Sequence, residues 1–149
     1  MIDTEHILIE AITNALEKMA FLTILPMDEE LQPPQEILLS EIHFSGSRNG
    51  TIQILAGADF TQLLAENVSA GQDTDREACL DVFRELSNVT CGLLLPALCG
   101  STEDIFDVTV PKVLWDQNVP AWNEFTADDH GQVLNVENNL VAVKLVDLQ

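Results

Sequence analysis

Residues 37–56 constrain the fold of this chain more than any other segment, because their polarity alternates as it does in a β-hairpin. Within residues 37–45, three apolar side chains share one face of an extended chain and three polar side chains share the other. The apolar face carries Leu38, Ile42 and Phe44, and the polar face carries Glu41, His43 and Ser45. The alternation resumes in residues 51–56, after the pair Asn49-Gly50. Because Asn and Gly both tolerate positive φ, this pair predicts the turn between two antiparallel strands.

Helical patterns lie on both sides of this hairpin. Residues 4–21 carry apolar side chains at helical spacing, and residues 26–35 form a loop because they contain two consecutive prolines. A short helix is predicted over residues 58–67 and a long one over residues 74–98. The acidic start of the long helix suits the helix dipole, and Gly100-Ser101 is expected to end it.

The remaining strands are predicted in the C-terminal third. Residues 105–114 read as a strand that Pro111 interrupts, which is typical of an edge or a bulge. Two final strands, residues 133–137 and 140–146, are expected to turn at Asn138-Asn139. The order helix, hairpin, helices and strands predicts an α/β (α+β) fold, with two long helices packed on one face of a sheet. The length of 149 residues suits a single domain covering residues 1–149.

The charge of the chain narrows the classes of partner. It has 25 acidic and only 6 basic residues, which gives a formal net charge of −19. Nucleic acids and anionic membranes are bound by clustered Lys and Arg, so the composition argues against both as partners. A partner surface that carries Lys or Arg fits better. Solubility alone is an equally good explanation of the acidic excess.

The N-terminal segment and the cysteines bear on the compartment. The first residues are acidic and lack the basic region and cleavage site of a signal peptide, and no apolar run reaches the length of a membrane span. Cys79, Cys91 and Cys99 form no CxxC pair, so we expect buried, reduced thiols. These features predict a cytoplasmic protein.

The familiar signatures of stand-alone enzymes do not occur in the sequence. His6, His43 and His130 are far apart and are expected on the surface or at strand edges, and the cysteines lack the spacing of a zinc site. There is no phosphate-binding glycine loop and no nucleophile elbow. Trp115 and Trp122 are more plausible as cover for the sheet than as anchors for a partner.

The polar face of the long helix is the candidate site. At about 100° per residue, Glu85 lies roughly 40° from Asp81 around the helix, and Asn88 lies roughly 20° from Asp81 in the other direction. A polar stripe of this kind is usually the solvated side of an amphipathic helix. Two points favour a site instead: Asn is a poor helix former, and Glu with Asn three residues later is not a stabilising pair.

The two helical regions also contain a weak internal repeat. The segment Ala11-Ile-Thr-Asn14 resembles Glu85-Leu-Ser-Asn88, half a chain further on, and each segment precedes an apolar run and then strands. A pseudo-twofold domain built from two helix-plus-sheet halves would account for this repeat. Because Ala11 takes the place of the acid in the first copy, only the second copy keeps the acid and the amide together.

The pattern Asp81-x3-Glu85-x2-Asn88, with Pro111 beyond the helix, resembles the signature of the CheC/CheX/FliY family of response-regulator phosphatases. The first helix, the hairpin and the closing strands are similar to this family as well, and the single signature resembles CheX rather than CheC. The resemblance implies a pseudo-twofold fold in which two long helices pack on a mostly antiparallel sheet. It also implies a homodimer that associates through its sheets.

In function, the resemblance implies a hydrolase of two-component signalling and chemotaxis that removes phosphate from the aspartyl-phosphate of a CheY-type receiver domain. Glu85 would dock the receiver lysine and Asn88 would orient the attacking water, with Asp81 and Pro111 in supporting roles. The protein would need no cofactor of its own, because the receiver binds the Mg²⁺. The alternative is a CheX-like adaptor that binds a signalling partner without catalysis, since a fold does not determine function. Turnover separates these two hypotheses.

Overall fold

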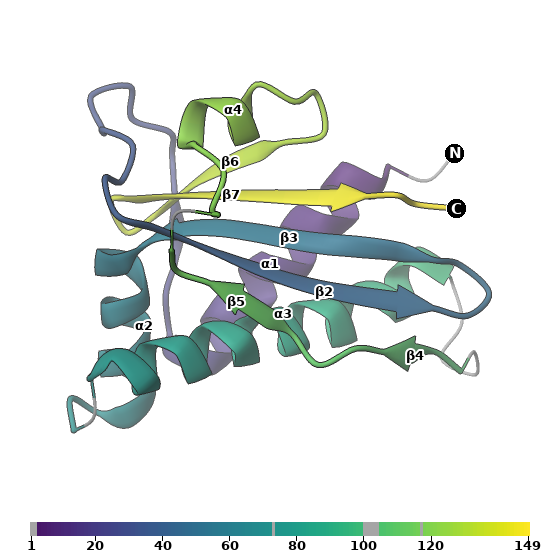
Figure 1. Ribbon diagram of the computed structural model, residues 1–149, viewed down its shortest axis with the longest axis horizontal. Helices are drawn as coiled ribbons and strands as arrows, with labels where there is room; N and C mark the ends of the chain where they lie inside the picture. Colours follow the sequence, from purple (N-terminus) through teal and green to yellow (C-terminus); the bar gives the residue numbers. More distant parts are fainter. Residues whose placement is uncertain (1–2, 73, 100–104, 117) are drawn as a thin grey trace.

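The structure is a computed structural model that describes residues 3–72, 74–99, 105–116 and 118–149. Within these residues, helices α1 (Thr4–Ala20), α2 (Ala58–Ser69) and α3 (Arg76–Cys99) lie on one face of a sheet. A five-residue helix, α4 (Trp122–Thr126), lies on the other face (Figure 1). The predicted layer of two long helices on one face of a sheet is therefore confirmed.

In the part of the chain that the structure describes, the sheet contains seven strands, and all of their pairings are antiparallel. Their order is β1-β6-β7-β3-β2-β4, and β5 also pairs with β2. The bounds of the strands are β1 (Ile24–Leu25), β2 (Ile37–Ser45), β3 (Gly50–Gly57), β4 (Asp107–Val108), β5 (Lys112–Leu114), β6 (Gln132–Val136) and β7 (Asn139–Val146). The alternating segments of the sequence therefore became the long strands β2, β3 and β7 and the shorter β6.

The two halves of the chain exchange edge strands. The short strand β1 from the first half pairs with β6 from the second, and β4 and β5 from the second half pair with β2 from the first. The long strands β3 and β7 pair with each other at the centre, as Figure 1 shows. The strand order stays the same, read from the opposite end, when each strand of one half is replaced by its counterpart in the other half. The pseudo-twofold arrangement suggested by the internal repeat is therefore present in the fold.

The main core lies between the helices and the sheet. Each helix turns an apolar stripe toward the strands, because side chains at helical spacing share one face. Fully buried side chains of this core include Ile12 and Leu16 of α1, Phe60 and Leu64 of α2, Phe83 and Leu86 of α3, and Ile42, Ile52 and Ile54 of the sheet. Burial of each such side chain contributes about 1.5–3 kcal/mol, so this layer holds α1 and α3 firmly in place.

A second, smaller core occupies the opposite face of the sheet. Trp122 and Phe125 of α4 pack there against Leu39, Leu55 and Ala142. The expectation that Trp122 covers the sheet is confirmed. The expectation that residues 115–131 form only a polar connection is wrong over residues 122–126, because a helix of five residues is too short to show a helical period in the sequence.

Both hairpins are present, but their turns differ from the prediction. Neither Asn49 nor Gly50 has a positive φ. Asn49 instead closes the loop by accepting a bond at Oδ1 from the Gly46 amide at 3.2 Å, and Gly50 is required because a Cβ there would lie 2.6 Å from Phe44 Cζ. In the second hairpin, Glu137 and Asn138 have φ of 47° and 73°. That turn therefore lies one residue earlier than predicted, and its two left-handed residues match the twist of the flanking strands.

The ends of three segments also compare directly with the sequence. The predicted strand over residues 105–114 is split at Pro111 into β4 and β5, as expected for an edge. The predicted helix end at Gly100-Ser101 lies outside the described residues. In contrast to the sequence expectation, α3 is long and apolar enough to cross a membrane, but half of that stretch is buried in the protein. A helix buried in a protein core can have the same length and apolar composition as a membrane-spanning helix.

Candidate functional site on helix α3

The polar side chains that the sequence predicted for the site lie on the exposed face of helix α3. Asp81, Glu85 and Asn88 are all exposed, whereas the neighbouring residues Val82 and Leu86 are buried. The burial of those neighbours fixes the rotation of the helix about its axis, so the polar side chains cannot turn inward. The structure thus brings together the stripe that the sequence predicted, on a rigid element.

Asp81 is paired within its own helix. Its Oδ1 lies 2.8 Å from Nη1 of Arg84, and the Asp81 side chain is 72% exposed. An exposed pair at this spacing contributes about 0.2–0.5 kcal/mol to the helix. The carboxylate of Asp81 therefore serves the helix surface in this structure and makes no contact that would orient Glu85.

Glu85 and Asn88 are available to a partner. In the described part of the chain, neither side chain makes a hydrogen bond or an ion pair. An incoming lysine or water would therefore not have to displace an internal bond at either residue. One acid and one amide, separated by less than one helical turn, can bind a cation and hold a water side by side.

A buried hydroxyl pair anchors the helix directly behind this stripe. The Oγ atoms of Ser40 in β2 and Ser87 in α3 are hydrogen-bonded, and both residues are fully buried. Ser87 lies between Glu85 and Asn88 in the sequence, so the bond fixes α3 to the sheet at the site itself. Sequence reasoning missed this pair, because a contact between residues so far apart in the sequence leaves no periodic signal.

Pro111 lies away from the polar face of α3, between two short edge strands. It is buried at the junction between β4 and β5, and β5 contacts α3. Its fixed φ and missing amide suit the interruption of an edge strand. Pro111 therefore helps to position the strand against which α3 packs, and it does not join Glu85 and Asn88 on the exposed face.

A groove opens beside Glu85 where α1, α2 and α3 meet. Its volume is about 320 Å³. One part of the wall is apolar and the other contains two carboxylates. The lining residues are Met19 of α1, Ala65, Val68 and Ser69 of α2, and Ala78, Asp81, Val82 and Glu85 of α3.

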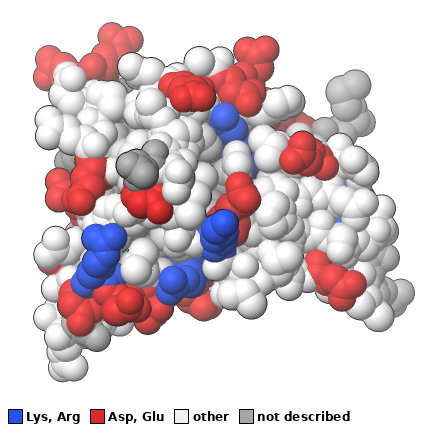
Figure 2. Space-filling view, viewed as in Figure 1, with Lys and Arg blue, Asp and Glu red and all other residues white. Residues whose placement is uncertain are grey.

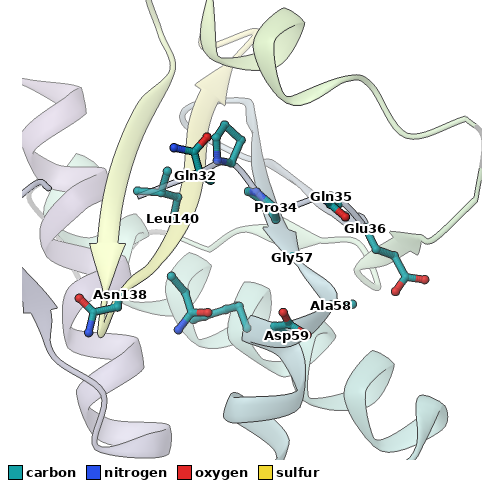
Figure 3. Close-up of a pocket in the computed structure, with 12 residues that line it drawn as sticks. Gln32, Pro34, Gln35, Glu36, Gly57, Ala58, Asp59, Asn138 and Leu140 are labelled. Carbon is teal, nitrogen blue, oxygen red and sulfur yellow. The ribbon is translucent and has the colours of Figure 1, made fainter. Parts of the chain in front are cut away.

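A larger cavity of about 450 Å³ lies apart from the stripe. Figure 3 shows Asn138 and Leu140 on one side of it and Glu36 on the other, with Asp59 at the start of α2 between them. None of the residues predicted for the site lines this cavity. The chemistry suggested by Glu85 and Asn88 therefore has no connection with it.

Other reactive side chains in the described residues do not form a catalytic set. No group of three or more His, Cys, Asp or Glu residues there is arranged to hold a metal ion. Burial raises the pKa of the Cys91 thiol to about 11, which keeps it protonated and unreactive at neutral pH. The His43 ring contacts two neighbours: Nδ1 lies 2.6 Å from Thr51 Oγ1, and Nε2 lies 3.3 Å from Glu41 Oε1.

The surface charge agrees with the composition. On the face shown in Figure 2, acidic side chains are spread widely and basic side chains are few. That face offers no broad basic patch of the kind that binds a phosphate backbone.

Solved structures place this fold in a recognised class. CheX from Desulfovibrio desulfuricans matches with a TM-score of 0.75 at 15% identity, covering 99% of this chain and 100% of that one. CheX from Vibrio vulnificus matches with a TM-score of 0.70 at 16% identity, covering 97% and 95%. A Borrelia burgdorferi structure described as a CheX–CheY–BeF₃–Mg²⁺ complex matches with a TM-score of 0.63 at 18% identity, covering 97% of each chain. The fold is thus that of CheC/CheX-like proteins.

The family follows from the sequence itself. The model of the family described as "Chemotaxis phosphatase CheX" matches residues 38–128, which is more than half of the chain. The chain therefore belongs to the CheX family, and the resemblance inferred from the stripe on α3 is confirmed. A comparison with curated protein sequences finds no match.

Proposed function

We propose that this protein hydrolyses the aspartyl-phosphate of a CheY-type receiver domain. The observation that carries the proposal is the exposed pair of Glu85 and Asn88 on α3, neither of which is engaged by another described residue. Membership of a family described as chemotaxis phosphatases supports it. So does the similarity to a CheX that was solved in complex with CheY, BeF₃ and Mg²⁺.

Asn88 is assigned the role of orienting the attacking water. Phosphoryl transfer needs little covalent help from the protein, so the position of the nucleophile and the stabilisation of charge control the rate. An amide both donates and accepts hydrogen bonds, so it can hold a water in line with the phosphorus atom. An amide also brings no negative charge toward the phosphoryl group, which a carboxylate at position 88 would do.

Glu85 is assigned the role of docking the receiver. Its carboxylate would pair with a lysine beside the phosphorylated aspartate, and interfacial charge pairs fix the register of two partners. The net charge of −19 further favours a receiver face that carries basic residues. The protein supplies no cofactor in this scheme, because the Mg²⁺ belongs to the receiver. Asp81 and Pro111 act indirectly, through the helix surface and the packing beneath it.

The test is dephosphorylation of a phosphorylated CheY-type receiver in the presence of Mg²⁺. Wild-type protein should accelerate the loss of phosphate. Asn88→Ala should lower the rate by about 10²–10³-fold, which is typical for the loss of one aligned polar group. Glu85→Ala should raise KM for the receiver, and circular dichroism should show that both variants are folded. Binding of receivers without any acceleration would favour the adaptor hypothesis instead.

We also propose that two copies associate through their sheets. The edge of the sheet at β4 carries apolar side chains in solvent: Ile105 is 88% exposed, Val108 45% and Val110 86%. An open strand edge with apolar side chains is a surface suited to pairing with another chain. Analytical ultracentrifugation should find a dimer that Val110→Lys weakens. A monomer at all concentrations would contradict this part of the proposal.

A further inference from the structure

The groove beside Glu85 joins an apolar surface to the candidate site, because Asp81 and Glu85 line it together with apolar side chains. Val68 of α2 is 49% exposed although it is a large apolar residue, and it lines this groove together with Met19 of α1. Figure 1 shows why the groove lies where it does: the end of α1, α2 and the beginning of α3 come together at one end of the molecule. Their side chains leave this hollow unfilled.

The groove has an apolar wall on one side and carboxylates on the other. Ala65, Val68 and Ala78 give an apolar wall, and Asp81 and Glu85 place carboxylates along the side formed by α3. Its volume of about 320 Å³ is enough to enclose a large side chain. A suitable occupant is therefore an apolar side chain that has basic residues next to it.

We propose that this groove receives an apolar side chain of the same receiver domain whose lysine pairs with Glu85. The inference rests on the proposed function, and it adds Val68 and Ala78 as residues that determine which receiver binds. A receiver lysine at Glu85 brings the surrounding receiver surface over the groove, because Asp81 and Glu85 both line it. Affinity for one receiver among several then depends on the apolar residue that it presents there.

Charge selects this occupant over a second copy of the chain. The groove has an acidic side, and the chain as a whole has 25 acidic residues against 6 basic ones. Two such surfaces repel each other, whereas a basic receiver face is attracted. The open edge at β4, which we assign to self-association, belongs to the sheet, whereas the groove is formed by the helices.

The first variant pair tests the groove by filling it. Ala78→Met places a long side chain in the groove, and Ala97→Met makes the same change at an exposed position of the same helix, outside the groove. We expect Ala78→Met to raise KM for the phosphorylated receiver by about tenfold, since overpacking a contact costs that order of affinity. Ala97→Met should leave KM unchanged, and neither variant should alter kcat.

The second variant pair tests the apolar wall. Val68→Ser removes an apolar contact and should raise KM by about threefold or more, whereas Val68→Ile keeps the wall apolar and should preserve KM. Equal KM for Val68→Ser and Val68→Ile, or for Ala78→Met and Ala97→Met, would overturn the proposal. A change of oligomeric state in Ala78→Met would also overturn it, because it would assign the groove to a second copy of the chain.

A binding measurement separates this inference from the proposed function. The same variants are titrated with a receiver loaded with beryllofluoride and Mg²⁺, which requires no turnover. If wild type binds without catalysing phosphate loss, the proposed function fails, and the order of affinities still decides the role of the groove. If wild type binds no receiver from its own organism, the groove proposal is overturned as well. Thermal melts equal to wild type establish that each variant is folded.

Discussion

The two long helices occupy equivalent places in the pseudo-twofold fold, but only α3 carries the candidate site. On α3 the acid Glu85 is exposed, and on α1 the corresponding residue is Ala11, which is 4% exposed. Both helices keep the amide, as Asn88 and as Asn14, and both amides are exposed. A fold with two equivalent helices therefore does not require two sites, because one acid makes the difference between them.

The residue directly before the amide shows a second difference. In α3 the Ser87 hydroxyl bonds across the core to Ser40 of β2. In α1 the corresponding Thr13 hydroxyl bonds to the carbonyl of Ile9 in its own helix, at 2.6 Å. The helix with the site is thus anchored to the sheet by a polar bond, and the other helix is held by apolar packing alone at this position.

The largest expected effect tests whether the two helices are equal as structural elements. Ile12 of α1 and Leu86 of α3 are at corresponding positions, and each has no exposed surface. We expect Ile12→Ala and Leu86→Ala each to lower the free energy of unfolding by about 2–5 kcal/mol, because each leaves a cavity in the core. Urea denaturation measures both. A small loss for one helix alone would break the structural equivalence.

The next largest effect on stability is expected at the hydrogen bond between Ser40 and Ser87. Ser87→Ala should lower the free energy of unfolding by about 1–3 kcal/mol, because it leaves the buried Ser40 hydroxyl without its partner. Thr13→Ala should change it by no more than about 0.5 kcal/mol, since that hydroxyl bonds locally on a partly exposed surface. The Ser40→Ala/Ser87→Ala double variant should recover part of the loss, and failure to recover would show that the pair does not act as a unit.

A substitution at Thr90 is expected to change stability less than the preceding ones, and in the opposite direction. Its hydroxyl is buried without a hydrogen-bond partner in the described structure, and the corresponding residue of α1 is the apolar Leu16. Thr90→Val should raise the free energy of unfolding by about 1 kcal/mol, because it removes an unsatisfied polar atom at nearly constant shape. A loss of similar size in the melting experiment would indicate that the hydroxyl is bonded.

Alkaline pH should lower stability through the buried thiol of Cys91 in α3. Burial raises the pKa of Cys91 in α3 from 9.0 to about 11 in the folded state. Its contribution to stability is therefore complete below pH 9 and is lost as the pH rises toward 11, because the unfolded chain ionises first. Cys91→Ala should flatten this part of the profile, whereas unchanged alkaline behaviour would assign it to other groups.

Much of this architecture could be predicted from local patterns. The alternation over residues 41–45 and the helical period around Leu86 survive in the structure, because burial on one face imposes them. Over residues 38–40 the alternation is lost, because both faces of β2 are covered there. The exposure of Glu85 and Asn88 follows from the same period. Their catalytic role was suggested by the family resemblance, and it stays a proposal.

Other features depend on contacts that a local pattern does not contain. The bond between Ser40 and Ser87 joins two elements, and each serine alone reads as an ordinary small polar residue. Helix α4 forms because Trp122 and Phe125 pack on the outer face of the sheet, which exists only after the strands pair. The displaced turn at Glu137 reflects the register of β6 and β7, which the positions of the two asparagines did not reveal.

We propose that α3, and not its counterpart α1, orients water for phosphate release. The most direct measurement compares Asn88→Ala with Asn14→Ala in dephosphorylation of a CheY-type receiver, using folded proteins of equal thermal stability. We expect a loss of about 10²–10³-fold for Asn88→Ala. For Asn14→Ala we expect a change within about twofold. Equal losses for the two variants, or full activity in Asn88→Ala, would show that α3 does not orient the water.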